Sequence, residues 1–383
     1  MSSNLGLLWL SFVPGLPYLV YRLQDVPFLW GLGVVVLLWI LYEIIQKILG
    51  LLEIKDIDRK AVFITGCDTG FGNLLAIKCV TRGMAVFAGC LTEKGAESLR
   101  KAAEFLPGKL ETIIVDVASD ESVAKAAAYL DKATEQYGGL HGVVNNAGIV
   151  GSSFFDDMLT TKDYKSVVEV NTFGVIRVTQ ATKHLVKKTR GRVVTVASIC
   201  ARVGIMGLGP YTVSKYAVSG YCEVIRQELR YFGVSVHILE PGFFRTPLID
   251  EKIVQARLDE MWKSVPENVK EEYGEKFFKE SRERATEMLH KIGSPHVHLV
   301  VDAYFHALTA RFPHLRYQIG NDSKFLFIPL SYLPTGLRDA LIVAAEKLSG
   351  APVPENALQK YAAPKATAIL IDDAKSNSSK GSK

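Results

Sequence analysis

The sequence has few cysteines and no strong excess of either charge. Its five cysteines in 383 residues show neither metal-ligand spacing nor a disulfide framework, so we expect reduced thiols. The net charge of +5 at pH 7 is mild, and no basic stripe or nucleic-acid motif accompanies it. His296 and His298 have few carboxylates nearby, which indicates a solvated pair and not a metal site. These absences argue against a metal centre and against DNA or RNA as a partner.

A glycine-rich loop follows a short apolar run near residue 60. The run Ala61–Thr65 predicts a buried strand, and an apolar helical pattern begins at Asn73. Between them lies Gly66-Cys67-Asp68-Thr69-Gly70-Phe71-Gly72, in the strand–loop–helix context that a dinucleotide-binding loop requires. The first glycine permits the turn, the second allows a pyrophosphate to approach, and the third lets the helix pack on the strand. The spacing is GxxxGxG and not GxGxxG.

Further apolar runs alternate with helical patterns up to about residue 240. Strands are expected at 84–91, 110–117, 140–144, 192–198 and 234–239, and helices at 93–105, 119–137, 161–188 and 211–232. This alternation predicts an α/β fold with a doubly wound parallel sheet of the Rossmann type. In such sheets ligands bind beyond the carboxyl ends of the strands. The residues expected at those ends are Gly66, Asp116, Asn145, Ser198 and Pro241.

Tyr211 and Lys215 are candidates for acid–base chemistry. They are four residues apart, and on a helix that spacing puts them on one face. A nearby ammonium favours the phenolate, so we expect Lys215 to ease the loss of the tyrosine proton. Ser198 is placed to hold an alcohol or carbonyl oxygen against the phenol. The three residues together indicate proton transfer to or from a carbinol oxygen.

These motifs as a set resemble the short-chain dehydrogenase/reductase family over roughly residues 58–250. The matching elements are the loop Thr65–Gly72, Asp116-Val117, Asn145-Asn146-Ala147-Gly148, Asn171, Ser198, Tyr211 with Lys215, and Pro241-Gly242. The runs TGCDTGFG and FAGCLTEKGAESL, with Phe325 to Leu337, are similar to the retinol and hydroxysteroid dehydrogenase branch. That branch includes microsomal enzymes and the related 3-hydroxybutyrate dehydrogenase.

The resemblance implies roles for individual residues. Tyr211 would be the catalytic acid/base, Lys215 would bind the nicotinamide ribose, and Ser198 would orient the substrate oxygen. Asn171 would hold a water in a proton relay from Lys215, so the implied catalytic set is Asn171, Ser198, Tyr211 and Lys215. The implied cofactor-binding residues are Gly66, Asp68, Thr69, Gly70, Phe71, Gly72, Asp116, Val117, Asn145, Ala147, Gly148, Tyr211, Lys215, Pro241 and Gly242.

The loop chemistry favours NAD over NADP. The 2′-phosphate of NADP usually needs an arginine or lysine, yet Thr69 is neutral and no basic residue follows the second strand until Lys94. The usual acidic partner of the NAD ribose is also missing after that strand. Asp68, inside the loop, is a candidate substitute for it, or else a cap of the following helix.

The N-terminal region, residues 1–57, predicts a membrane anchor. Val26 to Ile45 is nearly unbroken and apolar with Glu43 as its one charge, and about 20 such residues span a bilayer. Leu5 to Val20 is a second, shorter span or an interfacial segment. Basic residues gather after the anchor, with only Arg22 on the other side, which favours a cytosolic catalytic domain. With the resemblance, this predicts an endoplasmic reticulum membrane protein; use of the sequon at Asn321 would instead indicate a lumenal domain.

The remaining chain is divided into a catalytic domain, 58–345, and a polar tail, 346–383. Within the domain, residues 243–300 mix aromatic and charged residues and are expected to form a helical cap over an apolar substrate, or two amphipathic helices packed on the core, or both. The apolar stretch Leu326–Ala345 is a candidate for contact with a membrane surface. The tail after Ala363 is expected to be disordered.

The leading hypothesis is a membrane-anchored, NAD-dependent dehydrogenase of lipophilic alcohols, with a 3- or 17-hydroxysteroid first and retinol second. A 3-hydroxybutyrate dehydrogenase would need a cationic site for the substrate carboxylate and a mitochondrial address. A catalytically silent cofactor-sensing or lipid-binding module is the third possibility, but all four implied catalytic groups are present. Membrane lipid is an expected partner, and the helices at 161–188 and 211–232 make a homodimer plausible.

Overall fold

A seven-stranded parallel sheet forms the centre of the protein. The computed structural model describes residues 28–247 and 250–357. The strand order is β3-β2-β1-β4-β5-β6-β7, and every pairing is parallel. The strands are β1 Ala61–Thr65, β2 Ala85–Cys90, β3 Lys109–Ile114, β4 Gly142–Asn145, β5 Arg192–Val196, β6 Ser235–Pro241 and β7 Arg316–Ile319. The expected doubly wound α/β fold is therefore confirmed.

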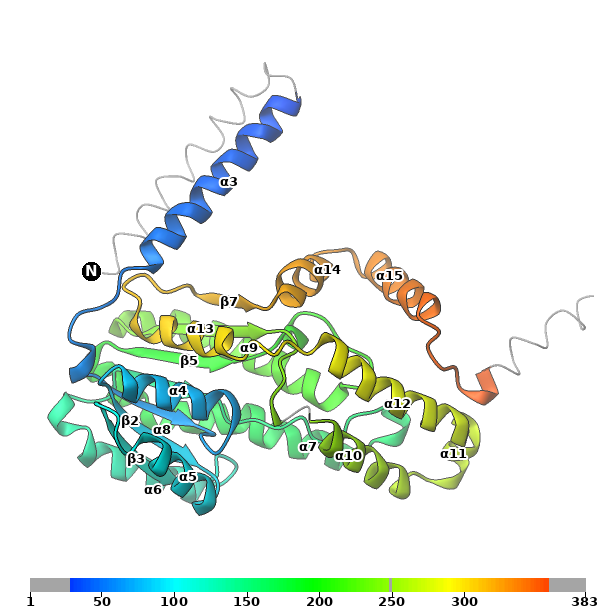
Figure 1. The fold of residues 1–383 in the computed structure, drawn as a ribbon, viewed down its shortest axis with the longest axis horizontal. Coiled ribbons are helices and arrows are strands. Elements are labelled where there is room, and N and C mark those ends of the chain that lie inside the picture. Colours follow the sequence, from blue (N-terminus) through cyan, green and yellow to red (C-terminus); the bar gives the residue numbers. More distant parts are fainter. Residues whose placement is uncertain (1–27, 248–249, 358–383) are drawn as a thin grey trace, which may run out of the picture.

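Helices cover both faces of this sheet (Figure 1). One core cluster joins the sheet to α4 (Gly70–Thr81), α5 (Glu93–Ala103) and α13 (His298–Thr309). The other joins it to α6 (Asp120–Ala133), α8 (Gly174–Thr189) and α9 (Gly209–Leu229). Because both faces are covered, the central strands β1, β2, β4 and β5 are buried throughout, which explains their unbroken apolar runs.

The structure differs from the sequence-based expectations at several boundaries. β1 agrees at both ends, whereas β3 ends at Ile114, so Asp116 lies in the turn beyond it. The single helix expected at 161–188 consists of α7 (Thr161–Val168), a π-helical turn η4 (Glu169–Phe173) and α8. β7 and α13 were not expected. β7 has four residues with alternating burial at the sheet edge, so it carries no apolar run that would reveal it.

The cap contains three helices within its described residues, where two were expected. They are α10 (Glu251–Ser264), α11 (Glu267–Tyr273) and α12 (Glu275–Ile292). Pro266 precedes α11, and Gly274, at φ 85°, separates α11 from α12. These two residues break the amphipathic pattern because proline lacks an N–H and a positive φ favours glycine. The cap has its own apolar cluster, in which Trp262 stacks on Phe278 at 4.3 Å between ring centroids.

A long apolar helix, α3 (Phe28–Gly50), projects from the domain (Figure 1). Its segment Trp30–Gly50 has a mean hydropathy of 2.0 and none of its residues is buried, so it is long and apolar enough to cross a membrane. The apolar segment expected to be the anchor, residues 26–45, lies in this helix except for residues 26 and 27, which precede it. The first apolar stretch, Leu5–Val20, lies outside the described residues.

The chain after β7 forms a series of short helices. They are a π-helical turn η8 (Ser323–Phe327), α14 (Ile328–Ser331) and α15 (Thr335–Leu348), so helix continues past residue 345. The tail expected to be disordered after Ala363 lies outside the described residues. Short 3-10 helices complete the fold: η1 Ile57–Arg59, η2 Glu135–Tyr137, η3 Asp156–Met158, η5 Ile199–Ala201 and η6 Arg230–Phe232.

A buried carboxylate fixes the end of β6. Glu240 is 0% exposed, and its Oε1 accepts a 2.7 Å hydrogen bond from Arg202 Nε and another from Arg316 on β7. Arg316 also forms an ion pair with the partly exposed Glu223 of α9. The cluster ties β6, β7, α9 and the loop after β5 together immediately before Pro241-Gly242.

Replacing Glu240 with alanine should lower the free energy of unfolding by about 3–5 kcal/mol, because two arginines lose their shared buried partner. Glu223→Ala is the matched control, and this more exposed member of the cluster should cost less than about 1 kcal/mol. Denaturant unfolding of both variants in one detergent measures the difference. Equal losses would mean that Glu240 does not hold the cluster together.

Candidate active site

The glycine loop between β1 and α4 has the geometry of a phosphate cradle. Gly66 and Gly70 have φ values of 71° and 68°, which favour glycine. A Cβ on Gly66 would lie 2.8 Å from Ala147 Cα, and one on Gly72 would lie 2.4 Å from Gly66 O, whereas Gly70 faces open space. Thr69, before the first turn of α4, makes no side-chain capping bond. The first N–H groups of α4 therefore remain available to an anion, and the loop fits a dinucleotide pyrophosphate.

Asp68 reaches across this loop to the end of β2. Its carboxylate accepts hydrogen bonds from Leu91 N at 2.8 Å, Thr92 N at 2.9 Å and Thr92 Oγ1 at 2.8 Å. The side chain therefore does not cap α4, which was the alternative left open by the sequence. The Asp68 carboxylate therefore lies at the end of β2, where the sequence has no acidic residue.

The other predicted nucleotide-side residues lie in different surroundings. Asp116 is exposed, and its carboxylate accepts the N–H of Ala118 at 2.9 Å in the turn after β3, while Val117 is buried. Asn145 is only 2% exposed, and its Nδ2 donates to Thr179 at 2.9 Å and to Thr195 at 3.2 Å. The Asn145 side chain thus points into the protein interior and not toward the rim.

Asn146, at the end of β4, and Tyr304, fully buried on α13, are two residues that the sequence did not mark individually as part of the site. Asn146 Nδ2 donates to Thr65 O at 2.9 Å and Gly66 O at 3.0 Å, and its Oδ1 accepts from Tyr304 Oη at 3.1 Å. Asn146 therefore joins the glycine loop to α13. Its place in the Asn-Asn-Ala-Gly run was a usable signal, whereas Tyr304 lies on a helix that no local motif marked.

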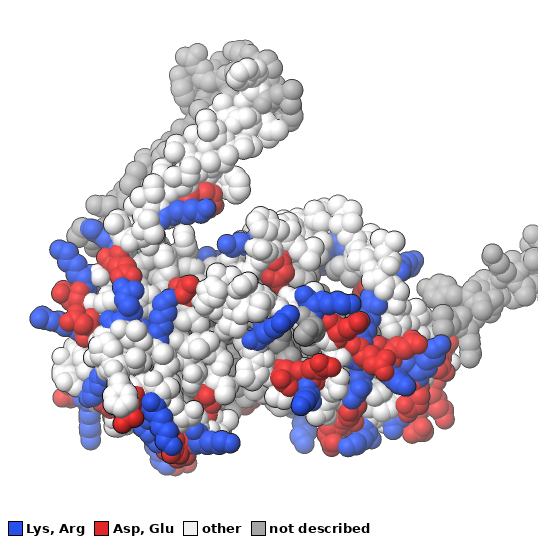
Figure 2. All heavy atoms as spheres, viewed as in Figure 1, with Lys and Arg blue, Asp and Glu red and all other residues white. Residues whose placement is uncertain are grey.

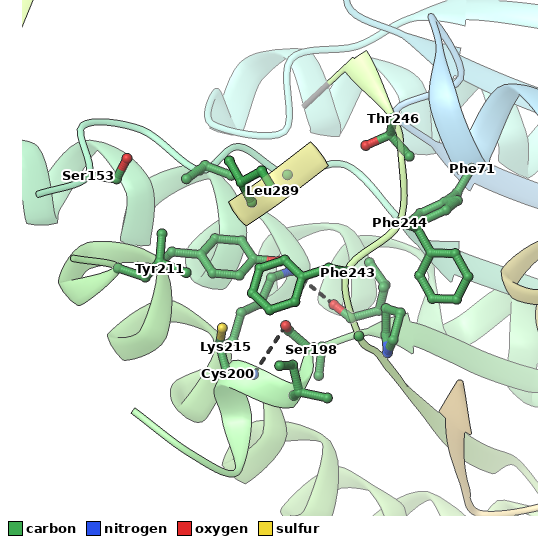
Figure 3. A pocket seen from close by; sticks show the side chains of 18 of the residues that line it. Phe71, Ser153, Ser198, Cys200, Tyr211, Lys215, Phe243, Phe244, Thr246 and Leu289 are labelled. Atoms are coloured by element: carbon green, nitrogen blue, oxygen red, sulfur yellow. Dashed lines mark hydrogen bonds between the residues drawn. The ribbon is translucent and has the colours of Figure 1, made fainter. Parts of the chain in front are cut away.

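A pocket opens where β4, β5 and β6 end, beneath the cap (Figure 3). Ser198, Tyr211 and Lys215 lie at its polar end, and Gly148, Pro241 and Gly242 also line it. Much of the remaining wall is apolar, from Phe71, Val150, Ile199, Leu208, Phe243, Phe244, Val254 and Leu289. Phe71 contacts Phe244 edge-on at 6.1 Å, so this residue of the glycine loop is also part of the pocket wall.

Tyr211, Ser198 and Lys215 come together as expected, but their electrostatics differ from the expectation. Burial raises the pKa of Tyr211, and a hydrogen bond with Ser198 opposes that rise. Burial also lowers the pKa of Lys215 from 10.5 to about 8. The lysine Nζ lies 5.4 Å from the Tyr211 ring centroid and donates to Val196 O at 3.0 Å (Figure 3). Burial disfavours the charged form of each group, and the expected lowering of the pKa of Tyr211 by Lys215 is not among the effects found here.

Asn171 lies in the π-helical turn η4, beside this group. Its Oδ1 accepts from Ile149 N at 2.8 Å, and its Nδ2 donates to Ile149 O at 2.8 Å and to Ser214 Oγ at 3.0 Å. A Cβ on Gly148 would lie 3.1 Å from Asn171 Oδ1 and 3.8 Å from Lys215 Nζ, so both polar groups lie close to this glycine. Both amide hydrogens of the Asn171 side chain already donate hydrogen bonds. The relay water expected from the resemblance would therefore have to donate to an oxygen of Asn171.

The chain matches known proteins over most of its length. Residues 60–256 match the family model described as short chain dehydrogenase. The chain is 45% identical to retinol dehydrogenase 7 of Rattus norvegicus over 289 residues, which cover 76% of this chain and 89% of that protein. It is 43% identical to 17-beta-hydroxysteroid dehydrogenase type 6 of Homo sapiens over 289 residues, with the same shares of each chain.

Solved structures share the fold. A short-chain dehydrogenase from Streptomyces avermitilis matches with a TM-score of 0.56 and 23% identity, over 76% of this chain and 97% of that one. A short chain dehydrogenase/reductase from Burkholderia phymatum in complex with NAD matches with a TM-score of 0.53 and 23% identity, over 65% of this chain and 85% of that one.

Replacing Lys215 with methionine should change how stability depends on pH. Below about pH 8 the folded protein holds an ammonium in surroundings that disfavour it. Between pH 8 and 10.5 the unfolded chain binds more protons there, so the stability of the parent protein rises with pH. The unfolding free energy of Lys215→Met relative to the parent should therefore fall by about 3 kcal/mol across this window. At pH 7 the variant should be the more stable protein, by about 1–2 kcal/mol after loss of the bond to Val196.

Denaturant unfolding of the protein without cofactor, at a series of pH values, measures this difference. Lys132→Met, on the exposed side of α6, is the control and should give a difference that does not depend on pH. A Lys215→Met curve parallel to that of the parent would contradict the burial argument.

Proposed function

The chain belongs to the short chain dehydrogenase family, and on that premise we propose that it is a membrane-anchored oxidoreductase of lipophilic alcohols. The observation that carries the proposal is the gathering of Ser198, Tyr211 and Lys215 at the polar end of an apolar, capped pocket beside the glycine loop. A nicotinamide cofactor, when bound, supplies or accepts the hydride.

The chain's own residues handle the proton. Tyr211 Oη takes the carbinol proton during oxidation and returns it during reduction, and Ser198 Oγ holds the reacting oxygen against the phenol. The pKa of Lys215 is lowered to about 8, so near neutral pH its ammonium group can give up a proton and take one back. Asn171 fixes Ile149 and Ser214 around this group, and the relay water expected from the resemblance would bind beside it.

The pocket wall supports a lipophilic substrate. Phe243, Phe244, Val254 and Leu289 offer apolar surface and exclude water, while the polar groups at one end fix the orientation of an alcohol. Two of the relatives are named for retinol and for 17-beta-hydroxysteroids. We propose a hydroxysteroid as the first substrate class and retinol as the second.

Asp68 supports NAD as the cofactor. Its carboxylate lies at the end of β2, the side of the cleft on which the adenosine ribose is held in dinucleotide folds. Ribose hydroxyls can donate to a carboxylate, whereas a 2′-phosphate would be repelled by it.

The composition of α3 supports a location at a membrane. α3 has the length and composition of a bilayer span, and Lys47, Lys55, Arg59 and Lys60 follow or end it. This distribution favours a cytosolic catalytic domain. The endoplasmic reticulum remains the proposed membrane, because the branch that the sequence resembles includes microsomal enzymes.

Purified protein given NAD and a hydroxysteroid should produce NADH, and Tyr211→Phe should reduce kcat at least about 10²–10⁴-fold by removing the proton acceptor. Tyr216→Phe, on the same helix but exposed, is the matched control and should keep its activity. Cofactor titration by fluorescence should show that the Tyr211→Phe variant still binds NAD.

The substrate panel includes steroids, retinol and 3-hydroxybutyrate. The last compound is included because Arg257, which lines the pocket, is a basic residue of the kind that a substrate carboxylate would need. NAD binding without turnover of any alcohol would favour a silent cofactor-binding module, and full activity of Tyr211→Phe would overturn the proposed mechanism.

Asp68→Asn tests the cofactor preference. Asparagine keeps one oxygen acceptor for the loop after β2 but removes the negative charge that would repel the 2′-phosphate of NADP. The ratio of kcat/KM for NAD to kcat/KM for NADP should therefore fall about tenfold or more, which corresponds to ~1.4 kcal/mol. Glu97→Gln, an exposed carboxylate on α5, is the control and should leave the ratio unchanged. An unaltered ratio in Asp68→Asn would remove Asp68 from the argument.

A further inference from the structure

α15 is an ordered helix that buries none of its residues. Arg338, Ile342 and Glu346 are half-buried at a spacing of four, so this face lies toward the body of the protein. A different stripe is apolar and exposed, and it follows the helical spacing along Leu337, Leu341, Ala344 and Leu348. In water this stripe would contribute nothing to stability.

The helix is nevertheless held in place at both ends. At its C-terminal end, Arg284 of the cap donates to Ser349 O at 2.7 Å and to Gly350 O at 3.3 Å. Toward its N-terminal end, α14 and η8 connect it to β7, and Ile328 and Ser323 there are buried. α15 therefore presents its apolar stripe in a fixed direction.

η8 and the end of α14 also expose large apolar side chains. Phe325 is 78% exposed, Leu326 is 56% exposed, and Tyr332 is 75% exposed. We call these side chains, together with the stripe of α15, the C-terminal apolar surface: Phe325, Leu326, Tyr332, Leu337, Leu341, Ala344 and Leu348. Exposed aromatic and leucine side chains gathered over adjoining elements mark a site of contact with an apolar partner.

This surface lies on the side of the domain from which α3 emerges. In Figure 1, α3, β7, α14 and α15 follow one another along the same side. Burial lowers the pKa of His314, while Glu43 of α3 raises it and Lys324 of η8 lowers it, so both charges lie near one imidazole. Figure 2 shows charged side chains over the cap, the lower edge and the left side of the domain below α3, and largely uncharged atoms over the upper part of α3 and over α14 and α15.

We propose that the C-terminal apolar surface lies in the interface of the same phospholipid bilayer that α3 crosses. An amphipathic helix with a fixed apolar stripe binds such an interface with its axis in the membrane plane. The occupant is lipid because the surface lies on the same side of the domain as α3, a helix with the composition of a membrane span. This proposal rests on the anchoring role given to α3 above.

The same segment also supports the wall of the pocket. Phe327 of η8 contacts Phe243 at 6.1 Å between ring centroids, and the Asp322 carboxylate accepts the N–H of Phe243 at 2.7 Å. Phe243 lines the pocket. A substrate dissolved in the bilayer would therefore enter over residues that already contact lipid, without crossing water.

Site-specific fluorescence tests the contact. All five native cysteines are buried, so a thiol-reactive environment-sensitive dye can be directed to introduced cysteines. The full chain, reconstituted in phosphatidylcholine vesicles, carries the dye at Leu341→Cys or Phe325→Cys. Asp339→Cys, on another side of α15, and Glu121→Cys, on α6, are the matched controls.

Dye at positions 341 and 325 should emit at shorter wavelength than dye at 339 and 121, and should be quenched by spin-labelled phosphatidylcholine. Equal emission and equal quenching at all four positions would overturn the proposal. A blue shift at 341 that resists lipid quenching and disappears on dilution of protein among vesicles would also overturn it, because the surface would then bind a second copy of the chain.

Activity measurements distinguish the proposed membrane contact from the proposed enzymatic function. The double variant Leu337→Asp/Leu341→Asp should lose kcat/KM several-fold for a membrane-dissolved alcohol in vesicles, yet match the parent in detergent. Lipid quenching at position 325 without turnover of any alcohol would retain the membrane contact and reject the proposed function. Unchanged vesicle activity of the double variant would reject entry of substrate through this surface.

Discussion

The parallel arrangement of seven strands is the constraint on which the rest of the molecule depends. The chain moves from β1 outward through β2 and β3, then returns to place β4 on the other side of β1, so the loops after β1 and β4 diverge. Gly66 and Gly148 follow these two strands, while Ser198 and Gly242 follow β5 and β6. Groups that are far apart in sequence therefore meet at one edge without any special long-range interaction, and the helices only have to cover the two apolar faces.

The chemistry at this edge depends on how the protein treats buried charge. Glu240 has two arginine partners, so its negative charge is compensated where β6 ends. Lys215 instead donates to a backbone carbonyl and has its pKa lowered to about 8 by burial. The first arrangement stabilises the frame, and the second leaves a group whose proton is easily given up. The charge that stabilises the frame, Glu240, lies in β6, and the charge that can take part in proton transfer, Lys215, lies on α9 and bonds the last residue of β5.

Features that depend on residues close together in the chain could be predicted from the sequence. The glycine loop at 66–72 and the pair Tyr211 and Lys215 follow from local turn and helix geometry, and the buried strands follow from apolar runs. Features that depend on distant residues were missed or misjudged: Tyr304 reaches Asn146 from a helix 158 residues away, and burial rather than Lys215 dominates the pKa of Tyr211. The direction of the Asn145 side chain belongs to the same group, because only tertiary packing determines which side of a strand end faces the cleft.

The connection between α3 and the sheet limits how the domain can move. Immediately after α3, Ile54 N donates to Thr309 O at 2.8 Å, Arg311 N donates to Leu52 O at 2.6 Å, and Glu53 pairs with Ala310. These backbone contacts restrict rotation of the domain relative to the helix. An α3 that crosses a bilayer would therefore limit the orientations of the domain and confine it to diffusion in two dimensions, so that its encounter rate with a membrane-dissolved substrate would follow the lateral concentration of that substrate and not the aqueous one.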